Sequence, residues 1–84
     1  MIISVDANHI KNGKKLALTC CPIALAIREQ TGYYPNVTAE EVNTVFYRFT
    51  LTRSAKSFIQ AFDKGKFVKP FRFKLQLMGN YHAD

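Results

Sequence analysis

The sequence is poor in the residues that would mark several large classes of protein. Its 84 residues include two cysteines, four glycines and only six acidic side chains. A chain of this length is expected to form one domain, residues 1–84, which buries only about 60–65% of the surface that its unfolded form exposes. Its core is therefore thin. Apolar residues still make up 48% of the chain, and this content predicts a folded domain rather than a disordered segment.

Long hydrophobic runs are also missing. The longest run, from Cys20 to Ile27, falls far short of the ~20 residues that span a bilayer. The N-terminus lacks the basic start and apolar stretch of a secretory signal. Cys20 and Cys21 are adjacent, and a disulfide between sequence neighbours is strained and closes no loop. We therefore expect reduced thiols, no membrane partner and a cytoplasmic location.

Signatures of metal sites are sparse. The candidate ligands are two neighbouring cysteines and two histidines, His9 and His82, and neither C-x-x-C nor H-x₃-H spacing occurs. A cysteine before the helix that begins at Pro22 could have its thiol pKa lowered by the helix dipole. As a nucleophile it would still need His9 as a base. A structural role for the thiols is the favoured interpretation, and no metal or cofactor is predicted.

Signatures of other enzyme classes are equally weak. Glu40 and Glu41 are sequence neighbours whose side chains point apart, which disfavours paired acid–base chemistry. The glycines are isolated, so the chain has no phosphate-cradling loop of the Walker or dinucleotide type. No catalytic residue is predicted, and we expect the protein not to be an enzyme.

The chain does contain a marked charge asymmetry. Residues 1–42 hold four Lys or Arg and four Asp or Glu, whereas residues 43–84 hold eight and two. All seven phenylalanines also lie in the second half. That half therefore builds much of the core and presents a cationic surface at the same time. Such asymmetry predicts an anionic partner and does not specify a reaction.

Local signals in the first half predict a strand, a short helical segment and a longer helix. Residues 1–5 read as a strand, followed by one or two helical turns that Asp6 caps and that Gly13 closes in the left-handed conformation. A longer, mostly apolar helix runs from Pro22 to Thr31 and stops at Gly32. The following pair, Tyr33 and Tyr34, is either a contact point for a partner or a lid that folds back on the core.

The second half predicts strand, helix and strand. Thr38 to Glu41 resembles a capping box and predicts a single turn, and alternation then favours a strand from Thr44 to Leu51. An amphipathic helix follows Thr52 and ends at Gly65. In the last strand, Phe71, Phe73, Leu75 and Leu77 share one face and Arg72, Lys74 and Gln76 the other. Residues after Met78 are expected to fray.

These elements predict an α+β fold in the order β-α-β-α-β. Two main helices would pack on one face of a small three-stranded sheet. The other face would present cationic side chains, with Phe46 among them. The edges of so small a sheet favour pairing between chains, so a homodimer joined edge to edge is a further expectation.

The candidate binding residues are the basic side chains of the outer sheet face, of the second long helix and of the loop between that helix and the last strand. They are Arg48, Arg53, Lys56, Lys66, Lys69, Arg72 and Lys74. Clustered cations attract phosphate backbones through Coulomb energy and counterion release. Exposed aromatic side chains, for which Phe46 and Phe67 are the candidates, stack on unpaired bases. A solvated cationic face without a partner is the alternative interpretation.

Three segments carry a resemblance to a known group of proteins: "ISVDANHIKNG", "CPIALAIREQTG" and "FIQAFDKGKFVKPFRFKL". Together they resemble a family of small uncharacterised proteins of bacteriophages and bacterial genomes. The resemblance implies an accessory protein of mobile elements that acts by binding. The target would be nucleic acid or another anionic molecule. Alternatively, the chain would be a phage counter-defence protein that inhibits a host nucleic-acid-handling protein by binding to it directly. In a phage-encoded protein, the location would be the host cytoplasm.

Overall fold

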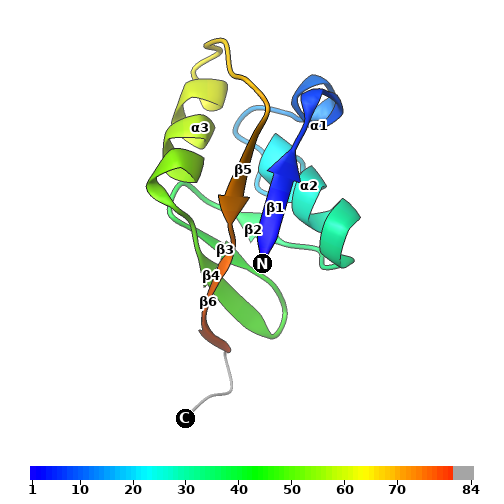
Figure 1. The fold of residues 1–84 in the computed structure, drawn as a ribbon, viewed down its shortest axis with the longest axis vertical. Coiled ribbons are helices and arrows are strands. Elements are labelled where there is room, and N and C mark those ends of the chain that lie inside the picture. Colours follow the sequence, from blue (N-terminus) through cyan, green and yellow to red (C-terminus); the bar gives the residue numbers. More distant parts are fainter. Residues whose placement is uncertain (81–84) are drawn as a thin grey trace.

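The computed structural model describes residues 1–80, which form an α+β domain (Figure 1). The three helices are α1 (Ala7–Asn12), α2 (Pro22–Thr31) and α3 (Arg53–Asp63). The six strands are β1 (Ile2–Val5), β2 (Asn36–Val37), β3 (Glu41–Asn43), β4 (Tyr47–Thr50), β5 (Phe71–Lys74) and β6 (Gln76–Asn80). None of the helices in this part of the chain has the length and apolar character needed to cross a membrane.

The strands form two antiparallel sheets rather than the predicted single three-stranded sheet. One sheet has the order β1-β5 and the other the order β2-β3-β4-β6. They meet where β5 continues into β6 at Leu75, so the last predicted strand is bent and belongs to both sheets. The α+β class was correct. The predicted order β-α-β-α-β was wrong, because short hairpin strands precede α3 and carry no long alternating pattern.

Short-range signals explain α1. The Asp6 carboxylate accepts hydrogen bonds from the backbone N–H groups of Asn8 and His9, and the His9 ring accepts one from Asp6 N–H. This reciprocal pair caps the helix start. Gly13 closes the helix with φ −72°, so the predicted left-handed conformation was wrong. Glycine is needed there for space, because an added Cβ would lie 2.6 Å from the Pro22 ring.

The two longer helices begin and end where the sequence predicts. Cys21 caps α2 through its sulfur, and Gly32 ends it at φ 81°. Thr52 caps α3 through its hydroxyl, and Gly65 follows its end at φ 76°. Glycine tolerates this left-handed backbone without the strain that a side chain would add.

The segment between α2 and α3 differs from the prediction. Instead of a helical turn, the Thr38 hydroxyl accepts from the N–H groups of Glu40 and Glu41 and so builds the turn between β2 and β3. The predicted strand from Thr44 begins only at Tyr47, because residues 44–46 form the turn that joins β3 to β4. Both turns rely on threonine hydroxyls bonded to nearby backbone.

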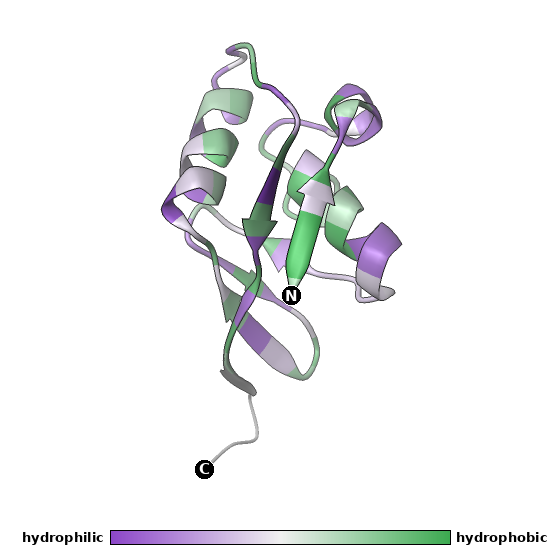
Figure 2. Cartoon of the chain, viewed as in Figure 1, coloured by the Kyte–Doolittle hydropathy of each residue, from purple (hydrophilic) through white to green (hydrophobic). Residues whose placement is uncertain are grey.

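The core lies between the two helices α2 and α3 and the inner faces of the sheets. Phe73 and Leu75 are buried, and the Phe71 ring stacks on Phe58 of α3 at 4.6 Å. Hydrophobic residues (green) and hydrophilic residues (purple) accordingly alternate along β5 (Figure 2). The predicted alternation is thus confirmed up to Leu75, whereas Leu77 is exposed beyond the bend. Strand β6 runs to Asn80, so fraying directly after Met78 was wrong, and residues 81–84 lie outside the described part.

Two outer strand edges are covered by other parts of the chain. The Gln30 side chain accepts a hydrogen bond from Ser4 N–H at 2.9 Å and donates one to Ser4 C=O at 2.7 Å, along the outer edge of β1. On β2, Val37 N–H donates to the backbone oxygen of Leu18 at 2.7 Å. Covering an edge in this way prevents unwanted pairing with other strands.

Candidate functional site

The loop from α3 into β5 carries two of the seven predicted binding residues, Lys66 and Lys69. It begins with a fixed turn, in which Gly65 N–H donates to Phe62 C=O and Lys66 N–H to Ala61 C=O. Val68 packs against the core, while its neighbour Phe67 is 85% exposed. The sequence of the loop therefore anchors one apolar side chain and presents the next to solvent.

Strand β5 continues this surface. Because Phe71 and Phe73 point inward to α3 and the core, Arg72 and Lys74 between them point outward and are exposed. We call the stretch from Lys66 to Lys74 the basic segment; its cations are Lys66, Lys69, Arg72 and Lys74. No acidic residue lies between positions 64 and 80. Among residues 1–80, none of these four cations forms an ion pair with a carboxylate.

Helix α3 carries two further predicted residues, Arg53 and Lys56. Its inner face consists of Ala55, Phe58 and Ile59, which leaves Arg53 exposed and Lys56 half-buried away from the core. The contact between Phe58 and Phe71 holds α3 beside β5 (Figure 1). Six of the seven predicted residues therefore lie on α3, the loop after it and β5.

Arg48 is the exception. It lies on β4 in the other sheet, and its Nε is 3.8 Å from the Glu41 carboxylate on the neighbouring strand. That acid reduces the local positive potential. We therefore leave Arg48 out of what we call the basic surface, which consists of the basic segment together with Arg53 and Lys56 of α3. The alternation of β4 correctly predicted that Arg48 faces outward, but the acid beside it comes from a pairing that the sequence does not specify.

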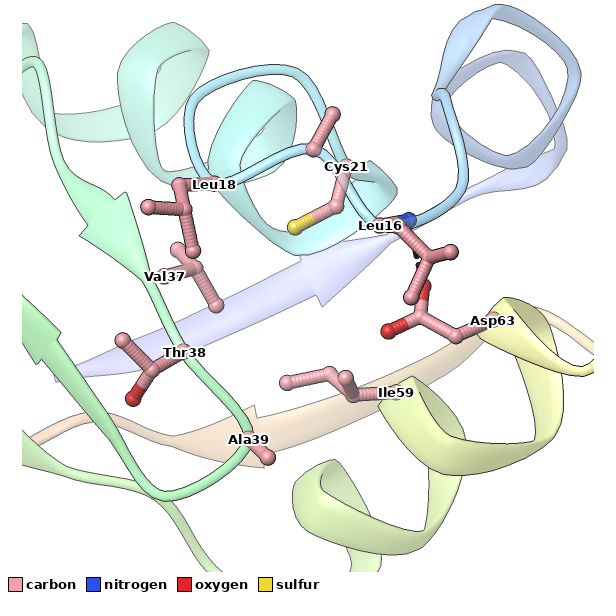
Figure 3. A pocket seen from close by; sticks show the side chains of 9 residues that line it. Leu16, Leu18, Cys21, Val37, Thr38, Ala39, Ile59 and Asp63 are labelled. Carbon is pink, nitrogen blue, oxygen red and sulfur yellow. Dashed lines mark hydrogen bonds between the residues drawn. The ribbon is translucent and has the colours of Figure 1, made fainter.

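A small pocket between the loop before α2, strand β2 and α3 has a volume of about 150 Å³ (Figure 3). The Cys21 sulfur points into it from one side, and the Asp63 carboxylate lies on another side, where it accepts from Leu16 N–H at 2.9 Å. The remaining wall is largely apolar, with Leu18, Val37 and Ile59 among its members. Its size and lining suit at most a very small apolar ligand.

The chemistry of Cys21 argues against a nucleophile. Burial raises the pKa of the Cys21 thiol, although backbone hydrogen bonds from Ala24 and Ile23 act in the opposite direction. The expected lowering of this pKa at the helix start was therefore wrong, because loss of hydration outweighs the helix end. Among the described residues that line the pocket there is no histidine to serve as a base.

A second cluster joins α1 to α2. His9 is buried, and its Nδ1 accepts from Asp6 N–H at 2.9 Å, so the proton of the neutral ring is on Nε2. Nε2 donates to Glu29 at 2.7 Å. Asp6, His9 and Glu29 bring ligand-type atoms within 4.8 Å of one another, but both ring nitrogens already have partners. Nothing in the sequence indicates the His9–Glu29 bond, which we interpret as a structural link between the two helices.

A wider groove opens at the opposite end of β5, where the chain bends into β6. We call it the aromatic groove; its lining includes Met1, Tyr33, Tyr47, Phe49, Lys74 and Leu77. Ring centroids of Tyr33, Tyr47 and Phe49 are 6.0–6.4 Å apart. Tyr33 thus contacts the core aromatic residues, as the lid interpretation predicts, and remains partly exposed. Its role as a contact point for a partner stays a prediction. Sequence reasoning missed this cluster because its members come from three separate segments.

Comparison of the chain with known protein families, with curated proteins and with solved structures finds no match. The resemblance to small proteins of phages and bacterial genomes therefore stays an expectation.

Proposed function

We propose that this protein is a non-catalytic binding protein that holds nucleic acid on its basic surface. In this proposal, the basic segment, together with Arg53 and Lys56 of α3, contacts the phosphate backbone. Phe67 stacks on an exposed base. Because a base is available for stacking only where it is unpaired, the favoured ligand is single-stranded DNA or RNA.

The observation that carries the proposal is the setting of Phe67. An aromatic side chain that is 85% exposed gains nothing for the core. In the sequence, Lys66 directly precedes Phe67 and Lys69 follows two positions later, and neither lysine has an acidic partner among residues 1–80. Aromatic rings among cations are the usual means of holding single strands without sequence preference. A purely solubilising surface would need the charges and not the ring.

The test is fluorescence anisotropy with a labelled oligothymidine, comparing two variants with equal loss of charge. Arg72→Gln with Lys74→Gln removes two cations from the outer face of β5. Lys11→Gln with Lys14→Gln removes two exposed cations from α1 and the loop after it. If the basic surface binds the strand, the first pair weakens binding much more than the second. Equal effects of the two pairs would mean that only net charge matters and would contradict the proposal.

Phe67→Ala adds a test that charge alone does not influence. Loss of one stacked base is expected to weaken binding by roughly 1–3 kcal/mol, which is about 5- to 150-fold. Phe67→Tyr keeps an aromatic ring and serves as the matched control. Indifference of binding to Phe67→Ala would remove the stacking role.

A second candidate function is binding to a protein, as in a phage counter-defence protein that inhibits a host nucleic-acid-handling enzyme. It is favoured by a different observation, the aromatic groove and the exposed apolar side chains of Tyr34, Val45 and Phe46 close to it. Exposed apolar surface of this kind is typical of protein interaction sites. Purification of the tagged protein from host lysate, with and without nuclease, separates the candidates, since only a protein partner survives nuclease treatment.

A further inference from the structure

Strand β6 has an outer edge that the described chain leaves open. Along the shared strand, the peptide groups of Phe71, Phe73 and Leu75 face β1, and Leu75 N–H donates to Met1 C=O at 2.7 Å. Peptide groups alternate between the two edges of a strand. Gln76 therefore faces β4, where it pairs with Thr50, and Leu77 faces the same edge as Leu75.

The pairing with β1 reaches Leu75 and stops there. No residue of the described chain pairs with the next position on this edge, the peptide group of Leu77. This differs from β1 and β2, whose outer edges donate hydrogen bonds to the Gln30 side chain and to the Leu18 carbonyl oxygen. An open N–H and C=O pair on a strand edge is a template for a further strand.

The same position lies in the aromatic groove. Leu77, Tyr33 and Tyr47 line a space of about 510 Å³, with Phe49 buried beneath them. In strand addition, main-chain hydrogen bonds supply affinity, and pockets for every second side chain supply specificity. A segment paired with Leu77 would place one apolar side chain over these rings.

The positive charge of the groove favours a bound segment that carries an acidic side chain. Its only charged side chain is Lys74, and no carboxylate is part of its lining. Because Lys74 and Gln76 share the outward face of the strand, a residue paired with Gln76 lies diagonally next to Lys74. Arg72 adds positive charge two residues further along this face. An acidic side chain at that position is therefore complementary.

We propose that the β6 edge and the aromatic groove bind an extended segment of a partner protein in which acidic and apolar residues alternate. The segment pairs antiparallel with β6, in line with β1. An apolar residue lies opposite Leu77, and an acidic one opposite Gln76. This inference specifies the protein-binding candidate. It shares Arg72 and Lys74 with the basic segment, but it does not involve Lys66, Phe67 or Lys69.

The test uses the capped peptide acetyl-Glu-Ile-Glu-Ile-Glu-amide and amide hydrogen exchange of the intact protein. We expect exchange at Leu77 N–H to slow on addition of the peptide. Acetyl-Lys-Ile-Lys-Ile-Lys-amide, and the acidic peptide with N-methylated isoleucines, are expected to bind at least about tenfold more weakly. Equal binding of all three peptides, or no change at Leu77, would overturn the proposal.

A matched pair of variants tests the position. Leu77→Asp and Met78→Asp alter neighbouring side chains of nearly equal exposure, 55% and 53%, but only Leu77 lines the groove. We expect Leu77→Asp to weaken peptide binding about tenfold or more, and Met78→Asp to change it about twofold at most. Equal losses would overturn the proposal. The proposal would also be overturned if oligonucleotide alone, or self-association of the free protein at high concentration, protected Leu77 N–H from exchange. Loss of oligonucleotide binding in Phe67→Ala, with peptide binding intact, separates failure of the two proposals.

Discussion

The side-chain amide of Gln30 replaces a missing strand at the outer edge of β1, and its removal gives a quantitative test of the fold. Gln30 makes two hydrogen bonds with the backbone of Ser4, of 2.9 and 2.7 Å. Each such bond contributes about 0.5–1.5 kcal/mol net. Because both lie at an exposed edge where water can replace the side chain, we expect Gln30→Ala to lower the free energy of unfolding by about 1–2 kcal/mol.

The assay is thermal and urea unfolding followed by circular dichroism. For a domain of this size, a loss of 1–2 kcal/mol corresponds to a decrease in Tm of roughly 4–16 °C. Gln60→Ala is the matched control, because Gln60 is an exposed glutamine on α3 whose side chain makes no hydrogen bond within residues 1–80. The helix propensities of the two substitutions are the same, so they cancel in the comparison. Equal midpoints for the two variants would refute the role assigned to Gln30.

Two further predictions concern buried polar groups. His9→Ala removes the hydrogen bonds to Asp6 N–H and Glu29, and we expect it to lower the free energy of unfolding in urea by about 2–3 kcal/mol. His9→Gln retains an acceptor for the Asp6 N–H and should lower it less. Equal losses for the two variants would contradict the capping role. Burial raises the pKa of the Cys21 thiol above its ordinary value of 9.0. As pH rises past that value the unfolded chain releases this proton first, so stability falls until the folded pKa is reached. Denaturant midpoints between pH 8 and 10 should therefore fall less in Cys21→Ser than in Cys20→Ser, and equal slopes would refute this assignment.

The parts of the fold that the sequence predicted depend on local chemistry. Helices α2 and α3 follow from Pro22 and Gly32, and from Thr52 and Gly65, which act within one turn of where they stand. The outward direction of Arg72 follows from the alternation of phenylalanines on either side of it.

The parts that could not be predicted depend on pairing between distant segments. Nothing local to Tyr33 indicates that its ring meets Tyr47, and nothing near Arg48 indicates that Glu41 lies on the adjoining strand. The bend at Leu75 has the same origin. Leu75 is hydrogen-bonded to Met1 on one edge, and the residues after it pair with β4 on the other edge. One continuous strand pattern in the sequence therefore corresponds to strands in two different sheets.

The most direct test of nucleic-acid binding is the salt dependence of the wild-type protein with oligothymidine. Contacts with single strands release counterions, and log K falls with log [salt] at a slope of about −0.7 for each phosphate that is neutralised. Engagement of six cations, Arg53, Lys56, Lys66, Lys69, Arg72 and Lys74, therefore predicts a slope of about −4, which should become shallower by about 1.4 in Arg72→Gln with Lys74→Gln. A slope near zero, or a slope that this double substitution leaves unchanged, would contradict binding through the basic surface.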